Sequence, residues 1–263
     1  GSYTVEISPI NESAPYIASV ATYQKNNFSF DTLGASLYQM QSGVGSTQYA
    51  PTDVSVGGCY QHVNNIQIAN TRRQSNTLAV SVVGADGVET FSDTLTLRPK
   101  QQLNFDAALY LDNQTFGSIK IMSTLRNAVI ANSVHYYSSC VDGQLQAAYN
   151  DTGVAYASNI RMASYETRPG TRNLLTLTNT SDERIRATVK LYGRQGEEIT
   201  STRYALNSHS TVKLNLNETL SQNFAPDFYG LLVVTAPNKI RSSLVRIREQ
   251  ETMLDVVLPI ESN

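Results

Sequence analysis

Ile66-Gln-Ile-Ala-Asn-Thr71 is repeated further along the chain as Leu175-Thr-Leu-Thr-Asn-Thr180. Two more matches lie at the same offset: Gly84-Ala-Asp-Gly87 corresponds to Gly193-Arg-Gln-Gly196, and Leu103-Asn-Phe105 to Val212-Lys-Leu214. A repeat of about 110 residues is too long for one solenoid unit and has the size of an independent domain. The repeat therefore predicts similar modules in series, which favours a scaffolding or binding role over a single catalytic centre.

Each copy consists of short segments with strand-like alternation, separated by turn residues. Residues 187–192 alternate apolar and polar side chains, which places Val189 and Leu191 on one face. The glycines of 193–196 accept positive φ and are typical of a hairpin connection. The expected strands are 66–69, 77–83, 90–97, 102–106, 117–122 and 129–137 in the first copy, and 173–178, 187–192, 199–206, 211–216, 230–235 and 240–248 in the second, with 254–258 closing this copy or belonging to a next one. This spacing, without long helical periodicity, predicts an all-β chain of tandem antiparallel β-sandwich domains of the immunoglobulin-like type.

The N-terminal segment matches the end of the first copy. Residues 5–23 align without a gap to 119–137, so residues 3–23 are interpreted as the last hairpin of a preceding copy. A lone hairpin is only marginally stable, which favours its docking on the next module. The predicted domains are a hairpin segment, 1–26, a first sandwich, 27–145, and a second sandwich, 146–263.

Composition favours an exported protein. Charged residues make up 16% of the 263 residues, below the usual ~25%, and the net charge is −2. A charge this small provides no general attraction to nucleic acid or to an anionic membrane. No apolar stretch reaches the ~18 residues of a membrane span. We expect a periplasmic, extracellular or cell-surface location and a larger parent polypeptide; Gly1-Ser2 resembles a tag remnant, so a native export signal would have preceded it.

Cys59 and Cys140 are the only cysteines in the chain, and neither has a cysteine counterpart in the second copy. They flank the predicted strands of the first copy, so a disulfide would tie the two ends of that module together. Closing a loop of this length contributes about 3–4 kcal/mol. Two unpaired thiols are the alternative.

The strand pattern of the two copies resembles tandem immunoglobulin-like or fibronectin-III-like sandwich repeats of bacterial exported and surface proteins. The resemblance rests on a strand ending in Asn-Thr, an alternating strand, a glycine-containing hairpin, a polar strand, and a glycine followed by Val/Ile/Leu alternation. It covers about 60–110 and 170–250. The resemblance implies a spacer, an adhesin or an accessory sugar-binding region. The immunoglobulin Cys…Trp…Cys signature is absent, because the chain contains no tryptophan.

The sequence offers little catalytic chemistry. It has no G-x-S-x-G, H-E-x-x-H or GxxxxGK[ST] motif, and no G-x-G-x-x-G after a strand. His62, His135 and His209 belong to different segments, and His135 is expected to point outward because Val134 takes the inward position. The carboxylate pairs Asp86/Glu89, Asp182/Glu183 and Glu197/Glu198 lie in turns, where they are usually solvated. The sequence therefore predicts a non-enzymatic protein without a metal or cofactor; a hydrolase with a site assembled between domains is a second alternative.

Two groups of residues are candidate binding sites. Lys190, Lys213, Arg246 and Arg248 take the polar phase of their strands and form a basic outward face if those strands share a sheet. Such a face would bind acidic polysaccharide or phosphate groups, or it is an ordinary solvated face. Tyrosines gather near the boundary between the copies, where they stack on sugar rings or pack a module interface: Tyr136, Tyr137, Tyr149, Tyr156 and Tyr165.

Together these features predict a structural or adhesion module that acts as a spacer or binds a cell-surface protein or polysaccharide. An accessory region that recognises acidic polysaccharide is the first alternative.

Overall fold

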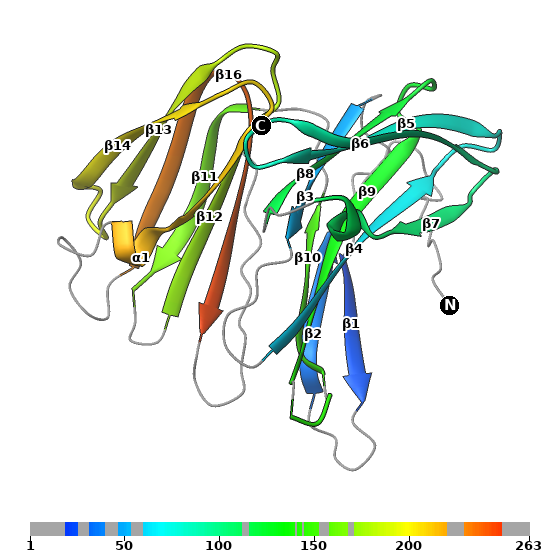
Figure 1. Ribbon diagram of the computed structural model, residues 1–263. Helices are drawn as coiled ribbons and strands as arrows, with labels where there is room; N and C mark the ends of the chain where they lie inside the picture. Colours follow the sequence, from blue (N-terminus) through cyan, green and yellow to red (C-terminus); the bar gives the residue numbers. More distant parts are fainter. Residues whose placement is uncertain are drawn as a thin grey trace, which may run out of the picture. The chain divides into compact units, whose positions relative to one another are not determined.

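The computed structural model describes residues 19–25, 32–39, 47–53, 60–111, 116–139, 141–143, 145–152, 158–167, 171–219 and 229–248, with side chains from Val63 onward apart from short gaps. The described chain is all-β, with several antiparallel strand pairs (Figure 1), as the sequence predicted. Its helical parts are one 3₁₀ turn, η1 (Ala107–Tyr110), and one α-helical turn, α1 (Leu216–Thr219).

The chain divides into two compact units. The first comprises residues 1–82, 91–112 and 119–155, and the second comprises residues 83–90, 113–118 and 156–263. The strands are β1 (Ser19–Lys25), β2 (Thr32–Gln39), β3 (Thr47–Asp53), β4 (Tyr60–Asn70), β5 (Asn76–Gly84), β6 (Glu89–Leu97), β7 (Gln102–Phe105), β8 (Phe116–Ser123), β9 (Val129–Ser139), β10 (Leu145–Thr152), β11 (Ser158–Glu166), β12 (Thr171–Asn179), β13 (Ile185–Tyr192), β14 (Glu198–Leu206), β15 (Thr211–Asn215) and β16 (Tyr229–Arg248).

Two four-stranded sheets share one core in the strands β3 to β10. One sheet has the order β3-β8-β5-β6 and the other the order β10-β9-β4-β7. Both sheets bury apolar side chains in the same cluster, including Ile66, Ile68, Leu78, Val80, Ile119 and Ile121. Burial of such side chains contributes about 1.5–3 kcal/mol each, which is the main force that holds the sheets face to face.

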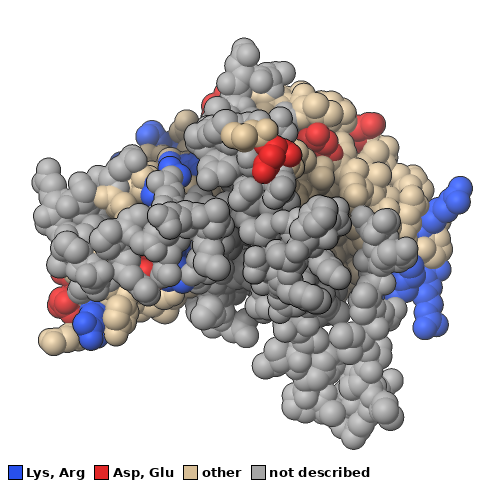
Figure 2. Space-filling view, turned by 90° about the horizontal axis from the view of Figure 1, so that it is seen from below, with Lys and Arg blue, Asp and Glu red and all other residues tan. Residues whose placement is uncertain are grey.

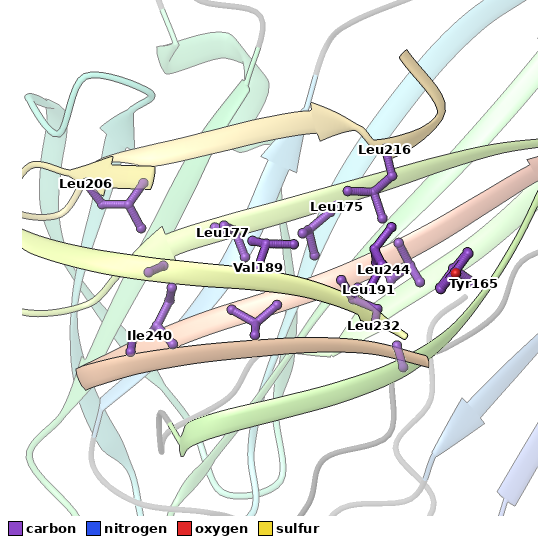
Figure 3. Close-up of a cluster of buried hydrophobic side chains, with 14 of the residues drawn as sticks. Tyr165, Leu175, Leu177, Val189, Leu191, Leu206, Leu216, Leu232, Ile240 and Leu244 are labelled. Carbon is purple, nitrogen blue, oxygen red and sulfur yellow. The ribbon is translucent and has the colours of Figure 1, made fainter. Parts of the chain in front are cut away.

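The strands β11 to β16 form the second arrangement, a single six-stranded hydrogen-bonded sheet in which the two halves of the long strand β16 have different neighbours. Tyr229–Thr235 of β16 lies between β11 and β13, whereas Ile240–Arg248 pairs with β12. The two parts of this sheet therefore have the orders β11-β16-β13-β14 and β16-β12-β15. Figure 3 shows the side chains that fill the space between them, among them Leu175, Leu177, Val189, Leu191 and Leu244.

Seven strands have the same pairing order in both arrangements. If the strands from β3 and from β11 are counted in chain order, with β16 counted as six and seven, both arrangements contain the orders 1-6-3-4 and 7-2-5, and the first has β10 as an eighth strand beside β9. Constant-type immunoglobulin domains instead have the sheets ABED and CFG. In this chain the seventh strand pairs with the second, and the first pairs with the sixth.

An asparagine at the end of β4 and of β12 organises the following turns in the same way. Asn70 Nδ2 donates to the carbonyls of Gln74, Leu97 and Arg98 at 2.9, 3.3 and 2.9 Å. Asn179 Nδ2 donates to the carbonyls of Glu183, Leu206 and Asn207 at 2.6, 3.4 and 2.8 Å. The three partners of Asn179 occupy the positions that the sequence repeat makes equivalent to the three partners of Asn70. We call each set an asparagine clamp.

Further backbone features recur at equivalent positions of the two copies. Lys100 lies shortly after β6 and His209 shortly after β14. Both residues have positive φ, at 58° and 55°. Gly87 and Gly196 take φ of 91° and 86°, and each donates its N–H to the carbonyl of the preceding glycine, Gly84 or Gly193, at 3.0 and 3.1 Å. The short sequence matches therefore mark turns with the same hydrogen bonds.

At the N-terminus, β1 pairs antiparallel with β2. Residues 3–18, the larger part of the predicted docked hairpin, lie outside the described residues, so its docking stays a prediction. The expected strand 254–258 also lies outside them.

Candidate functional site

The register does not bring the four predicted basic residues onto one face. Lys213 on β15 lies opposite Thr176, whereas Arg246 on β16 lies opposite Asn173. Thr176 and Asn173 are an odd number of residues apart on β12, so they point to opposite faces. Arg246 is on the inward face, where its Nη1 lies 3.1 Å from Glu166 Oε2 and the side chains are only 16% and 6% exposed.

The other two basic residues also lie apart. Lys190 points outward from β13, which pairs with the first half of β16 and not with β12, and its Nζ lies 2.7 Å from Glu198 Oε2. The hydrogen bond and charge of Glu198 raise the pKa of Lys190. Arg248 is the last residue of β16, and its side chain lies outside the described part. A ligand-binding role for these four residues therefore has no shared surface to support it and stays a sequence prediction.

The tyrosines near the boundary have different environments. Tyr136 is half-buried on β9, opposite Val63 of β4, and the side chain of Tyr137 lies outside the described part. Tyr165 is 1% exposed and donates its hydroxyl to the Tyr192 carbonyl at 3.2 Å. Burial, with a smaller contribution from the charge of Glu197, raises the pKa of Tyr165 to about 12. Tyr165 is therefore a core residue and cannot stack on a sugar.

A buried polar cluster of Asn64, Ser133 and His135 lies at one end of the core of the first unit. Asn64 Nδ2 donates to Ser133 Oγ at 2.7 Å, and Ser133 Oγ lies 2.9 Å from His135 Nε2. The three residues are 2%, 0% and 2% exposed. The expectation that His135 points outward is wrong: Val134 is also fully buried, so burial of one residue does not place its neighbour in solvent.

The second unit has a different polar cluster at the corresponding register position. His135 lies opposite Asn64, and Arg246 lies opposite Asn173. Asn173 exchanges hydrogen bonds with the backbone of Glu166, and its N–H and Nδ2 donate to Asn217 Oδ1 at 2.8 and 2.9 Å. In this cluster Arg246, at the position of His135, forms the ion pair with Glu166.

Five exposed cations lie in three turns at one end of the first unit: Arg72 and Arg73 after β4, Arg98 and Lys100 after β6, and Arg126 after β8. We call this set the basic end. The turn segments 70–76, 97–102 and 123–128 contain no Asp or Glu. Figure 2 shows Lys and Arg atoms gathered at the right-hand end of the view without Asp or Glu among them, and β4 points toward this end in Figure 1.

Hydrogen bonds hold these three turns together. The Asn70 clamp joins the first two turns, because its Nδ2 binds the Gln74 and Arg98 carbonyls, and Lys100 N–H donates to the Arg72 carbonyl at 3.1 Å. The third turn is joined by Arg72 Nη2, which donates to the Arg126 carbonyl at 2.7 Å. The backbone positions of the cations are therefore fixed relative to one another.

The basic end was not predicted from the sequence, because whole strands separate its three turns along the chain. The repeat nevertheless contains a signal for it. Positions 72, 73, 98 and 100 are cationic, whereas the equivalent positions of the second copy are Ser181, Asp182, Asn207 and His209. In the second unit His209 Nε2 instead lies 2.8 Å from Asp182 Oδ1.

Other sequence predictions gain no site from the structure. Cys59 and Cys140 both lie outside the described residues, and their pairing stays a prediction. Within the described ranges, no group of three or more His, Cys, Asp or Glu side chains is arranged to hold a metal ion. Among the same residues, no helix is long and apolar enough to span a membrane.

Comparisons with known proteins provide no family. No family model and no curated protein matches the chain. Among solved structures, the PBSX exported protein XepA is 8% identical, with a TM-score of 0.25 over 88% of this chain and 89% of that one. The M60 catalytic domain with the CBM51-1 and CBM51-2 domains of Clostridium perfringens ZmpB is also 8% identical, with a TM-score of 0.19 over 83% of this chain and 34% of that one. Likeness this low carries no argument about function.

Proposed function

We propose that the chain consists of two copies of one β-sandwich in tandem. The shared strand order, the two asparagine clamps and the paired glycine turns support this proposal, because each recurs at equivalent positions of the sequence repeat. The modules resemble immunoglobulin-like repeats in having two layers of strands around one core, and they differ from constant-type immunoglobulin domains in strand order.

The proposed function is that of a non-enzymatic structural or adhesion module in an exported or surface protein. The structural part of this proposal is supported by the recurrence of the same hydrogen-bonded turns at Asn70 and Asn179, and its non-enzymatic part by the burial of Ser133 and His135, at 0% and 2% exposure. A nucleophile and its base must reach a substrate, and this hydrogen-bonded pair is enclosed in the core. The corresponding residues of the second unit, Leu244 and Arg246, offer no nucleophile.

The buried polar clusters are better explained by a role in stability. Buried polar groups restrict the core to arrangements in which every donor and acceptor is satisfied. Short, hydrogen-bonded turns such as those at Asn70 and Asn179 also suit a module that must keep its shape as a spacer or adhesin.

Single-molecule pulling of the full chain tests the structural role, and a panel of ester, amide and glycoside substrates tests the absence of catalysis. We expect two separate unfolding events and no turnover above that of the Ser133→Ala variant. A single unfolding event would contradict two independent modules. Turnover that disappears in the Ser133→Ala variant, with folding unchanged, would contradict the non-enzymatic role.

A further inference from the structure

The basic end has the properties of an anion-binding surface. Its five cations are exposed, and the turns that carry them contain no acidic residue. In the described part of the chain, the guanidinium groups of Arg73, Arg98 and Arg126 form no ion pair with a carboxylate. The field of like charges held close together therefore remains available to an external anion.

The cations are fixed by the fold rather than scattered over it. The hydrogen bonds from Asn70 and Arg72 tie the three turns into one surface. Four of the five cations are arginines, whose planar guanidinium binds carboxylate or sulfate through two parallel hydrogen bonds. A surface fixed in this way loses less entropy on binding a chain that carries regularly spaced anions.

Both units have the asparagine clamp, but only the first unit has cations in the turns that the clamp joins. The second unit has the same turns around Asn179, with Ser181, Asp182, Asn207 and His209 at the positions of the four cations near Asn70. The clamped turns therefore fold without these cations, and their charge is not required by the architecture. A net charge of −2 for the whole chain makes this concentration of cations at one end more pronounced.

From these observations we propose that the basic end binds an acidic polysaccharide through the carboxylate or sulfate groups of several successive sugars. The proposal deepens the adhesion role proposed above and rests on it. The same turn segments also contain side chains suited to sugar hydroxyls, among them Thr71, Gln74, Ser75, Gln101 and Asn127. The three turn segments contain no aromatic ring for stacking nucleic-acid bases. Their only large aliphatic side chains, Leu97 and Leu125, pack against the core instead of forming an apolar surface for lipid.

Binding of the full chain to dextran sulfate and to polygalacturonate tests the proposal and separates sulfate from carboxylate recognition. The variant is Arg73→Gln/Arg98→Gln/Arg126→Gln, because the structural hydrogen bonds of Arg98 and Arg126 use only backbone atoms. The matched control is Arg184→Gln/Arg186→Gln/Arg203→Gln, which removes the same charge from exposed residues of the second unit.

We expect binding to at least one probe that weakens with added salt. The basic-end variant should lose about tenfold or more in affinity and the control about twofold or less. No binding to either probe, or equal losses in the two variants, would overturn the proposal. Tighter binding of a single-stranded oligonucleotide or of anionic vesicles than of either polysaccharide would also overturn it, in favour of that partner. The pulling experiment is independent of these ligands, so its outcome distinguishes failure of this site from failure of the structural role.

Discussion

Replacing Asn179 should destabilise the second unit by more than the loss of one ordinary hydrogen bond would. The Asn179→Ala change removes the three hydrogen bonds that the side chain donates to the carbonyls of Glu183, Leu206 and Asn207. It also removes the two hydrogen bonds that the side chain accepts from Ser181. Asn179 is fully buried, so water does not readily replace these partners. With about 1–3 kcal/mol for each buried group left unsatisfied, the loss is about 3–4 kcal/mol.

An Asn179→Asp variant tests the direction of these bonds. The carboxylate has nearly the same shape, but it places an acceptor against three carbonyl oxygens in place of a donor. We expect Asn179→Asp to be less stable than Asn179→Ala at pH 7. Its stability should recover on acidification toward pH 4, where the new carboxyl gains a proton and can donate again.

Urea unfolding followed by far-UV circular dichroism measures both changes, with Asn70→Ala and Asn70→Asp as the equivalent pair in the first unit. The exposed Gln195→Ala is the control, because the hydrogen bond of Gln195 to Glu197 uses its backbone N–H, and it should change stability by no more than about 0.5 kcal/mol. The reasoning would be refuted if Asn179→Ala were as mild as the control, or if the aspartate variant were more stable than the alanine variant at pH 7.

Two further predictions concern buried groups of the second unit. Burial raises the pKa of Tyr165 from 10.0 to about 12, so folding favours its neutral form. The contribution of this group to the free energy of unfolding is fully present below pH 10 and falls by on the order of 1–2 kcal/mol as the pH rises toward 12. Unfolding titrations should show this loss in the native chain and a smaller one in Tyr165→Phe, and identical slopes would contradict it. For the buried pair of Arg246 and Glu166, either single change, Arg246→Met or Glu166→Gln, should cost about 3–5 kcal/mol. The double variant should cost less than the sum in a double-mutant cycle, whereas additive losses would show that the two groups do not interact.

The sequence was sufficient to predict the strands of the two repeated cores, but it predicted neither β2, β3, β10 and β11 nor the face that each side chain takes. Residues 187–192 alternate regularly, and the structure has Val189 and Leu191 in the core as predicted. Alternation misplaced His135 and Arg246, because Val134 and Val245 beside them are also buried, at 0% and 9% exposure. Where both faces of a sheet are covered, alternation no longer separates inward from outward residues.

The clamps and the basic end depend on contacts that sequence patterns do not contain. The Asn-Thr ending of β4 and β12 was recognised as a repeated feature, but the partners of Asn70 include carbonyls 27 and 28 residues away. Likewise, Arg73, Arg98 and Arg126 become neighbours only when three turns meet at one end of the sandwich. The difference in charge between equivalent turns of the two copies is the sequence signal that identifies this end.

The central claim, that both units are the same sandwich, is tested most directly by long-range nuclear Overhauser effects across the seventh and second strands of each unit. The account predicts contacts between the strand of His135 and that of Asn64, and equally between the strand of Arg246 and that of Asn173, in the same register. Contacts in one unit but not in the other, or in a shifted register, would contradict it.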